Sequence, residues 1–355
     1  MKVRISLILM AQLMLAACSD DTKELFSDVP IALNAGIMPV DAGTRAIETD
    51  EIRGNVPSNE YPLDALLFFT TTPKTYDKSP VPVAPSYLPC RTTISYTSGT
   101  KTYPAPLGDN DIKYPLGNDM VYCVGLYPDD VYVNEGDKGW KIEGDATVTA
   151  SRDLDGETDI LFAPEISGQL YTPFGTQTYS HLQAWVKLNV CAVDPEAVEA
   201  WGKIESIKIT GRENIKIALD TEFGNMKELK TAIDEGKIVY SNELTLDLVK
   251  NSDNVSLNTQ LVELSSFFYV PVNVTDSITG NKLVIETEKK GTKEVEFDLV
   301  DANNNVIKHL SGALGKIFVI ELHFFPIEII KAKCTLNQWE DWTDNLYMDK
   351  EDISI

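Results

Sequence analysis

The sequence lacks the residue patterns on which most catalytic and cofactor sites depend. Among 355 residues there are only three histidines, His181, His309 and His323, and they stand far apart. The chain contains no nucleophile elbow, zinc-protease helix, phosphate-binding loop or dinucleotide-binding glycine pattern. Nothing in the sequence pairs a histidine with another histidine or with a nucleophile. We therefore expect each histidine to be hydrogen-bonded within the fold or to face solvent, and we expect no enzyme, catalytic residue or cofactor.

Positive charge is also scarce. The chain has 31 Lys and Arg against 54 Asp and Glu, a formal net charge of −23. Such a surface repels nucleic acid and anionic lipid head groups, which excludes DNA and RNA as partners. With so many acids, a pair of carboxylates carries no information about glycosidase chemistry. The densest cluster, residues 153–159, lacks the spacing of a calcium-binding EF-hand loop, so we interpret it as a solvated turn and expect no metal site.

Cysteines are few and widely spaced. Four follow residue 89, and they form no C-x-x-C pair and stand beside no paired histidine, which makes a zinc site improbable. Three disulfide connectivities are open to them, and buried free thiols are the preferred interpretation because two lie in apolar, strand-like runs. The four residues are Cys90, Cys123, Cys191 and Cys334.

The longest apolar run is residues 5–15, which is shorter than the roughly 20 residues that a membrane-spanning helix needs. Two basic residues precede it, and the sequence Leu15-Ala-Ala-Cys18 follows, as in a bacterial lipoprotein signal. This predicts a signal peptide over 1–17, cleavage between Ala17 and Cys18, and a lipid on Cys18. An ordinary signal peptide with a chance cysteine is the alternative. The acids after Cys18 resemble the surface-export signal of Bacteroidetes lipoproteins, which implies a lipid-anchored protein on the outer membrane at the cell surface.

The remaining chain alternates apolar and polar residues with a period of two. The pattern is clearest over residues 181–192, 293–300 and 316–324, and it predicts half-buried antiparallel strands. Two stretches predict short helices. Residues 194–202 have Asp194 as N-cap, Pro195 in the first turn and Gly202 as a stop, and residues 224–237 place Met226, Leu229 and Ile233 at helical spacing and end near Gly236. The fold class is therefore all-β. The chain length favours two β-sandwich domains, 46–178 and 179–355, with residues 194–202 as a rival boundary.

Several short motifs, in order along the chain, resemble the fimbrillins of Bacteroidetes, which are lipoprotein subunits of donor-strand pili. They are Cys18 in its lipobox, "TRA" at 44–46, "ETDILFAPE" at 157–165, "SHLQAWVKLNV" at 180–190, "GKIFVIELHF" at 315–324 and "AKCTLNQWEDW" at 332–342. Trp185 and Val186 differ from the residues that the family usually has in this strand. The resemblance implies two sandwiches of transthyretin-like, Greek-key topology. It also implies a pilus or fimbria subunit that serves adhesion.

The resemblance further implies that an Arg-specific protease cuts after Arg45, which would make Ala46 the new N-terminus. Residues 29–38 are apolar enough for a core strand, with one face formed by Val29, Ile31, Leu33, Ala35 and Ile37. Losing residues 18–45 would open a groove with unpaired backbone groups. A strand from another pilin subunit, with residues 327–355 as the donor candidate, would fill that groove by β-addition. Repeated head to tail, such a contact makes an open filament.

The alternative is a surface lipoprotein that binds glycans or host proteins and does not polymerise. Its support is the set of tryptophans, which we expect to be exposed and able to stack on sugar rings. These are Trp140, Trp185, Trp201, Trp339 and Trp342. The sequence leaves the stalk, tip and anchor roles of a pilus equally open.

Overall fold

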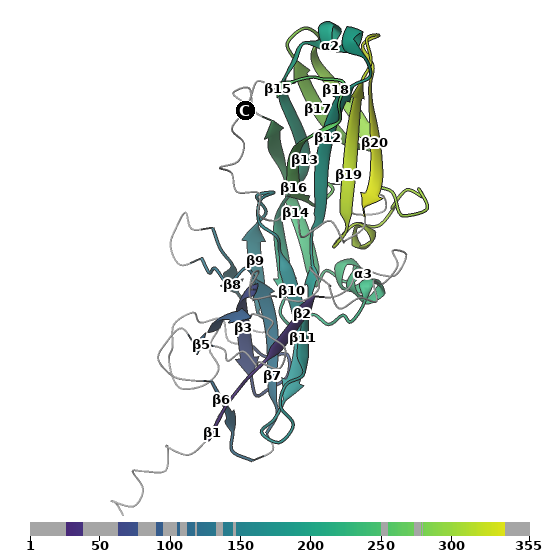
Figure 1. Cartoon of the computed structure of the whole chain (residues 1–355). Helices are drawn as coiled ribbons and strands as arrows, with labels where there is room; N and C mark the ends of the chain where they lie inside the picture. Colours follow the sequence, from purple (N-terminus) through teal and green to yellow (C-terminus); the bar gives the residue numbers. More distant parts are fainter. Residues whose placement is uncertain are drawn as a thin grey trace, which may run out of the picture.

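The computed structural model describes residues 26–37, 63–76, 90–94, 105–106, 112–117, 119–132, 138–144, 147–249, 255–272, 278 and 280–337. Ala17, Cys18, Arg45, Ala46 and the tail 338–355 lie outside the described residues, so the predictions for them stay predictions. Strands make up most of the described chain, in sheets stacked along a long axis (Figure 1). The predicted all-β class is confirmed.

The first half of the chain builds a seven-stranded sheet, the N-terminal sheet. Its strand order is β2-β11-β10-β7-β3-β4-β5. In that order the strands are Asn34–Ile37, Thr176–His181, Leu161–Gly168, Val121–Tyr127, Leu63–Thr70, Cys90–Ile94 and Ala105–Pro106. A separate two-stranded ribbon joins β1 (Phe26–Pro30) to β6 (Lys113–Pro115). Neighbouring strands of the sheet run antiparallel except β2, which is parallel to β11.

Both faces of the N-terminal sheet are covered. Five consecutive residues of β3, 65–69, are buried, which explains why this strand is a continuous apolar run rather than an alternating one. Leu66 and Phe68 join the large core shared with the second half of the chain, whereas Leu67 and Phe69 face a smaller core, the N-terminal cluster. The buried members of the N-terminal cluster are Ile31, Leu33, Ala65, Leu67, Phe69, Cys90, Ile112, Tyr114, Val121, Cys123, Leu161, Ala163, Phe174 and Tyr179.

A second sheet joins the two halves of the chain. Its order is β18-β17-β13-β9-β8, and β14 and β15 also pair with β13. These strands are Gly291–Phe297, Asn281–Thr287, Lys203–Ala218, Thr149–Asp153, Lys141–Glu143, Ile238–Val249 and Val255–Ser256. The long strand β13 pairs with β17 near its start and with β9 over residues 214–218. The predicted boundary between residues 178 and 179 falls inside β11, and the division into two domains stays a prediction.

The third sheet covers the second sheet in the C-terminal half. Its order is β16-β12-β19-β20, formed by Val262–Tyr269, Ala184–Ala192, Ile317–Phe324 and Ile330–Asn337. The apolar positions predicted for β12 and β19, such as Val186, Leu188 and Ile320, are fully buried in the large core. β12 and β19 are parallel neighbours, although the alternation predicted antiparallel strands. An alternating pattern reports which face is buried and not the direction of the neighbouring strand.

Both predicted helices are present, and the first begins at its predicted N-cap, Asp194. The α2 helix (Pro195–Trp201) starts at Asp194, whose Oδ1 accepts a hydrogen bond from the Ala197 N–H at 2.7 Å. The α3 helix (Met226–Asp234) starts at Asn225 in the same way. A short 3-10 turn, η1, spans Leu310–Gly312. Within the described ranges, no helix has the length and apolarity to cross a membrane.

Candidate functional site

The candidate site is the N-terminal strand pair, residues 26–37, together with the groove that holds it. β1 pairs antiparallel with β6, and β2 lies at the outer edge of the N-terminal sheet beside β11 (Figure 1). Residues 34–37 of β2 pair in register with residues 176–179 of β11. The pair therefore contributes an edge strand to one sheet and half of a separate ribbon.

Residues 31–33, between the two strands, insert into the N-terminal cluster. Ile31 is 0% exposed and Leu33 is 2% exposed. The Ile31 N–H donates to the Ile112 carbonyl at 2.7 Å, which holds this connection against the chain that leads into β6. Burying an aliphatic side chain of this size contributes about 1.5–3 kcal/mol. Two anchors therefore secure the strand pair in the core.

The prediction of one continuous core strand over residues 29–38 is wrong. The structure has two strands that pair in different sheets, and Val29 is 47% exposed instead of lying on the buried face. Pro30 is the last residue of β1, where it pairs with Lys113. The Ile31 N–H makes one more bond to this side of the chain, at Ile112. The backbone then changes partner from β6 to β11. Ile31 and Leu33 are buried as predicted, whereas the side chains of Ala35 and Ile37 lie outside the described part of the structure.

A group of aromatic rings belongs to the same N-terminal cluster as Ile31 and Leu33. The Phe174 ring stacks on Tyr114 and meets Phe69 edge-on, each with a centroid separation of 6.0 Å. The Phe174 N–H donates to the Tyr114 hydroxyl oxygen at 3.2 Å. These contacts tie β6 to the turn before β11, so the two strands that receive the strand pair are held together without it.

Gly125 on β7 lets the sheet accept the ring of Tyr179 from β11. A Cβ atom at Gly125 would clash with the Tyr179 hydroxyl oxygen. Tyr179 itself is fully buried in the N-terminal cluster. Any larger residue at position 125 would therefore have to displace the buried Tyr179 ring.

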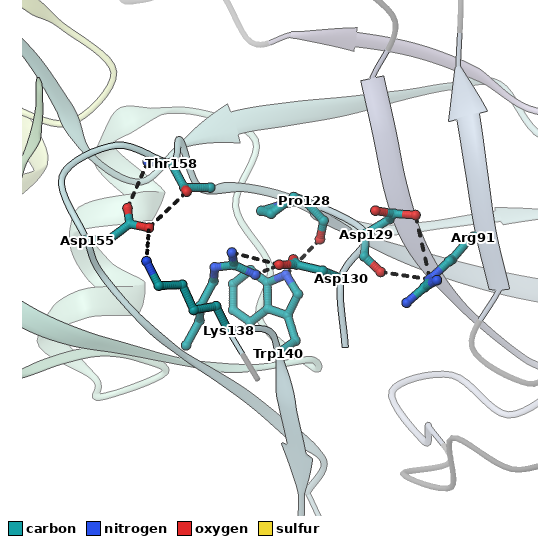
Figure 2. A network of polar contacts seen from close by, with 9 residues as sticks. Arg91, Pro128, Asp129, Asp130, Lys138, Trp140, Asp155 and Thr158 are labelled. Atoms are coloured by element: carbon teal, nitrogen blue, oxygen red, sulfur yellow. Dashed lines mark hydrogen bonds and ion pairs between the residues drawn. The ribbon is translucent and has the colours of Figure 1, made fainter. Parts of the chain in front are cut away.

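A polar network fixes the loop after β7 on the opposite side of the N-terminal sheet. Figure 2 shows Asp130 beside Trp140, whose indole N–H donates to the Pro128 carbonyl at 2.8 Å. The guanidinium of Arg152, only 5% exposed, donates to both carboxylate oxygens of Asp130. The Arg91 Nε on β4 lies 3.6 Å from the Oδ2 of Asp129, which belongs to the same loop as Asp130. The network joins β4 and β9 to this loop and stabilises its position.

The acidic stretch 153–159 distributes its carboxylates among separate partners. Asp155 accepts hydrogen bonds from the backbone N–H groups of Glu157 and Thr158. Figure 2 shows it beside Thr158 and Lys138, and the Lys138 Nζ lies 3.7 Å from the Asp155 Oδ2. Asp159 lies 2.6 Å from His181. Within the described residues, no three such side chains converge in a way that would hold a metal ion. The stretch is thus a hydrogen-bonded turn, and His181 is a histidine with a partner inside the fold.

The fold places His323 beside Cys191, a pairing that the sequence analysis missed. The two residues are register partners on β12 and β19, and the Cys191 Sγ lies 3.2 Å from the His323 Nδ1. Glu321 lies 3.4 Å from the other ring nitrogen. Burial, followed by the negative charge of Glu321, raises the pKa of the Cys191 thiol, which disfavours the nucleophilic thiolate. Both residues alternate outward on their strands, but only the parallel register brings them together.

The remaining predicted residues are placed as follows. Cys90, Cys123, Cys191 and Cys334 are free thiols. The first three are buried, as the preferred interpretation held, whereas Cys334 is half-buried. Trp140 and Trp201 are fully buried, so the expectation that they are exposed is wrong. Each indole N–H donates to a backbone carbonyl, which makes burial of the ring favourable. Trp185 is partly buried and packs edge-on against Phe268, and Trp339 and Trp342 lie outside the described residues.

Comparison with protein families and with curated proteins finds no match. Among solved structures, the chain is similar to a proposed cell adhesion protein from Bacteroides uniformis. The TM-score is 0.50 at 10% identity, over 88% of this chain and 99% of that one. This chain has that fold.

Two further solved structures are similar at lower scores. A proposed cell adhesion protein from Bacteroides ovatus has a TM-score of 0.46 at 13% identity, covering 88% of this chain and 96% of that chain. A fimbrial protein from Bacteroides vulgatus has a TM-score of 0.42 at 9% identity, covering 78% and 92%.

Proposed function

We propose that this chain is a cell-surface protein of the adhesion type, and that it is a fimbrial subunit assembled by strand exchange. The observation that carries the proposal is the position of residues 26–37. This segment fills a sheet edge and a core position, yet it precedes every other described element of the chain. The fold shared with the Bacteroides uniformis cell adhesion protein supports the surface role.

A cut after Arg45 would separate the whole strand pair from the rest of the fold. Arg45 follows β2 in the sequence, and the next described strand, β3, begins at Leu63. After the cut, no covalent bond would join β1 and β2 to the rest of the fold, and strand pairing and the burial of Ile31 and Leu33 would help to hold them. The strand pair would then be replaceable by any segment that offers equivalent pairing and two apolar anchors.

The vacated groove would be a template for a partner strand. Residues 176–179 of β11 would lose their register partners, and the N-terminal cluster would lose two of its buried side chains. Unpaired edges recruit strands, with main-chain hydrogen bonds giving affinity and alternate side chains giving register. The incoming strand would come from the C-terminal region of another subunit, with residues 327–355 as the candidate.

Limited digestion tests this proposal. The full-length chain is treated with an Arg-specific protease, and products are followed by N-terminal sequencing and by sizing in SDS. A single rapid cut that yields Ala46, followed by SDS-resistant ladders, is the expected result. Arg45→Lys should block both the cut and the ladders, while Arg53→Lys, a matched change nearby, should leave them intact. A stable, uncut wild-type monomer would contradict the proposal and favour a non-polymerising surface protein.

Two further experiments test the donor segment and the anchor. Deleting residues 338–355 should leave the cut at Arg45 unchanged but abolish the ladders, and ladders that persist would exclude this tail as the donor. Mass spectrometry of the membrane fraction should find a diacylglyceryl group on Cys18. An unmodified Cys18 would contradict the lipid anchor without touching the strand-exchange proposal.

A further inference from the structure

A pocket of about 430 Å³ is lined by residues of α3 and of the chain around the η1 turn. Figure 1 shows where α3 lies in the molecule. Four lysines contribute to its lining: Lys227 and Lys230 from α3, Lys308 before η1, and Lys316 after it. The other polar side chains are those of His309 and Ser311. Among the described residues that line the pocket there is no Asp or Glu, although acids outnumber basic residues 54 to 31 in the chain.

Two of the four lysine charges have no neutralising partner. Lys230 pairs with Asp234 one helical turn away, and the positive charge of Lys316 acts on Asp301. Lys227 and Lys308 are exposed and make no ion pair within the described part of the chain. Grouped lysines repel one another, so two unpaired ammonium groups at one cavity favour a bound anion that relieves this repulsion.

The shape and donors of the pocket narrow the ligand class. The cavity is within the size range of small-molecule sites, which begins at about 300 Å³. Lysine ammonium groups bind anions as point charges, whereas His309 and the largely buried Ser311 add directional hydrogen-bonding groups. We propose that this pocket binds a small anionic saccharide, one that carries a carboxylate or sulfate group next to hydroxyls. The proposal does not rest on strand exchange.

Isothermal titration calorimetry on the full-length chain tests the pocket. The probes are a uronic acid disaccharide, a sulfated disaccharide, a neutral disaccharide and sodium sulfate. We expect one anionic disaccharide to bind, with affinity that falls as salt rises, and the neutral sugar to give no heat. The anionic probe that binds identifies whether the group recognised is a carboxylate or a sulfate.

Variants assign the binding to this pocket. Lys227→Ala combined with Lys308→Ala should weaken binding about tenfold or more, since the double change removes two ammonium groups that would donate charge-assisted hydrogen bonds to the anion. Lys203→Ala, which removes an exposed lysine near α2 at the other end of β13, should bind like the wild type. Circular dichroism would compare the melting temperatures of all variants. We expect them to be equal, because both substituted pocket lysines are exposed.

Three results would overturn the proposal. They are no binding of either anionic disaccharide, binding that the double variant leaves unchanged, and sodium sulfate binding as tightly as the disaccharides.

Discussion

Replacing Ile31 with alanine should loosen the N-terminal strand pair while leaving the rest of the fold intact. Ile31 is fully buried in the N-terminal cluster, and its backbone N–H donates to Ile112. An isoleucine-to-alanine change in a core costs about 2–5 kcal/mol, because the transfer free energy and the cavity both contribute. Val29→Ala is the matched control, since Val29 is 47% exposed and surface changes of this kind stay within about 0.5 kcal/mol.

The lost free energy should make local opening of the strand pair more frequent. A change of about 2 kcal/mol raises the population of the open form roughly 30-fold. Hydrogen exchange measured by mass spectrometry would follow residues 31–37 and their β11 partners, residues 176–179. Amides of the central strand β13 serve as the internal reference and should keep their exchange rates.

Two results would refute this reasoning. If Ile31→Ala exchanged like Val29→Ala, the buried anchor would contribute nothing to holding the strand pair. If β13 exchanged faster to the same degree, the strand pair would be part of the global folding unit and not a separately removable segment.

Three further predictions concern other parts of the fold. Asp194→Ala removes the N-cap of α2 and should lower the free energy of unfolding by about 1 kcal/mol in urea titration, whereas Glu196→Ala on the exposed first turn should cost less. Cys90 and Cys123 should react with iodoacetamide only in urea, because burial raises the pKa of both thiols; labelling in the native state would contradict their placement. Burial tends to raise the pKa of Asp155, but hydrogen bonds from the Glu157 and Thr158 N–H groups outweigh it and lower the pKa below 3.8. This carboxylate therefore stabilises the fold above its unfolded pKa, and the contribution is lost as pH falls through the folded value. Asp155→Asn should consequently flatten acid unfolding below about pH 4. An unchanged acid midpoint would show that this carboxylate contributes little.

The sequence was sufficient for features that local patterns determine. The alternation over β12 and β19 predicted which face is buried, because a half-buried strand has a period of two. The helix α2 was predicted at its observed bounds, because Asp194 and Gly202 supply its caps locally.

Features that depend on which strands meet could not be predicted. The change of partner after Pro30 needs β6 and β11 in place, although residues 26–37 and 176–179 lie far apart in the sequence. The Cys191–His323 contact follows from a parallel register that alternation does not encode. Burial of Trp140 depends on a carbonyl acceptor from another segment, that of Pro128.

A reversible disulfide between β1 and β6 would show whether the strand pair must leave its place before subunits join. Pro30 on β1 and Lys113 on β6 are register partners. Cysteines at these two positions, Pro30→Cys and Lys113→Cys, should therefore form a disulfide, which needs a Cα–Cα separation of about 4.4–6.8 Å. After the cut at Arg45, the oxidised double variant would keep its strand pair attached. We expect the oxidised double variant to form no SDS-resistant ladders until a reductant opens the disulfide. The single variant Lys113→Cys should form ladders without reductant. Ladders from the cut, oxidised double variant would contradict the claim that the strand pair must leave the groove before subunits join.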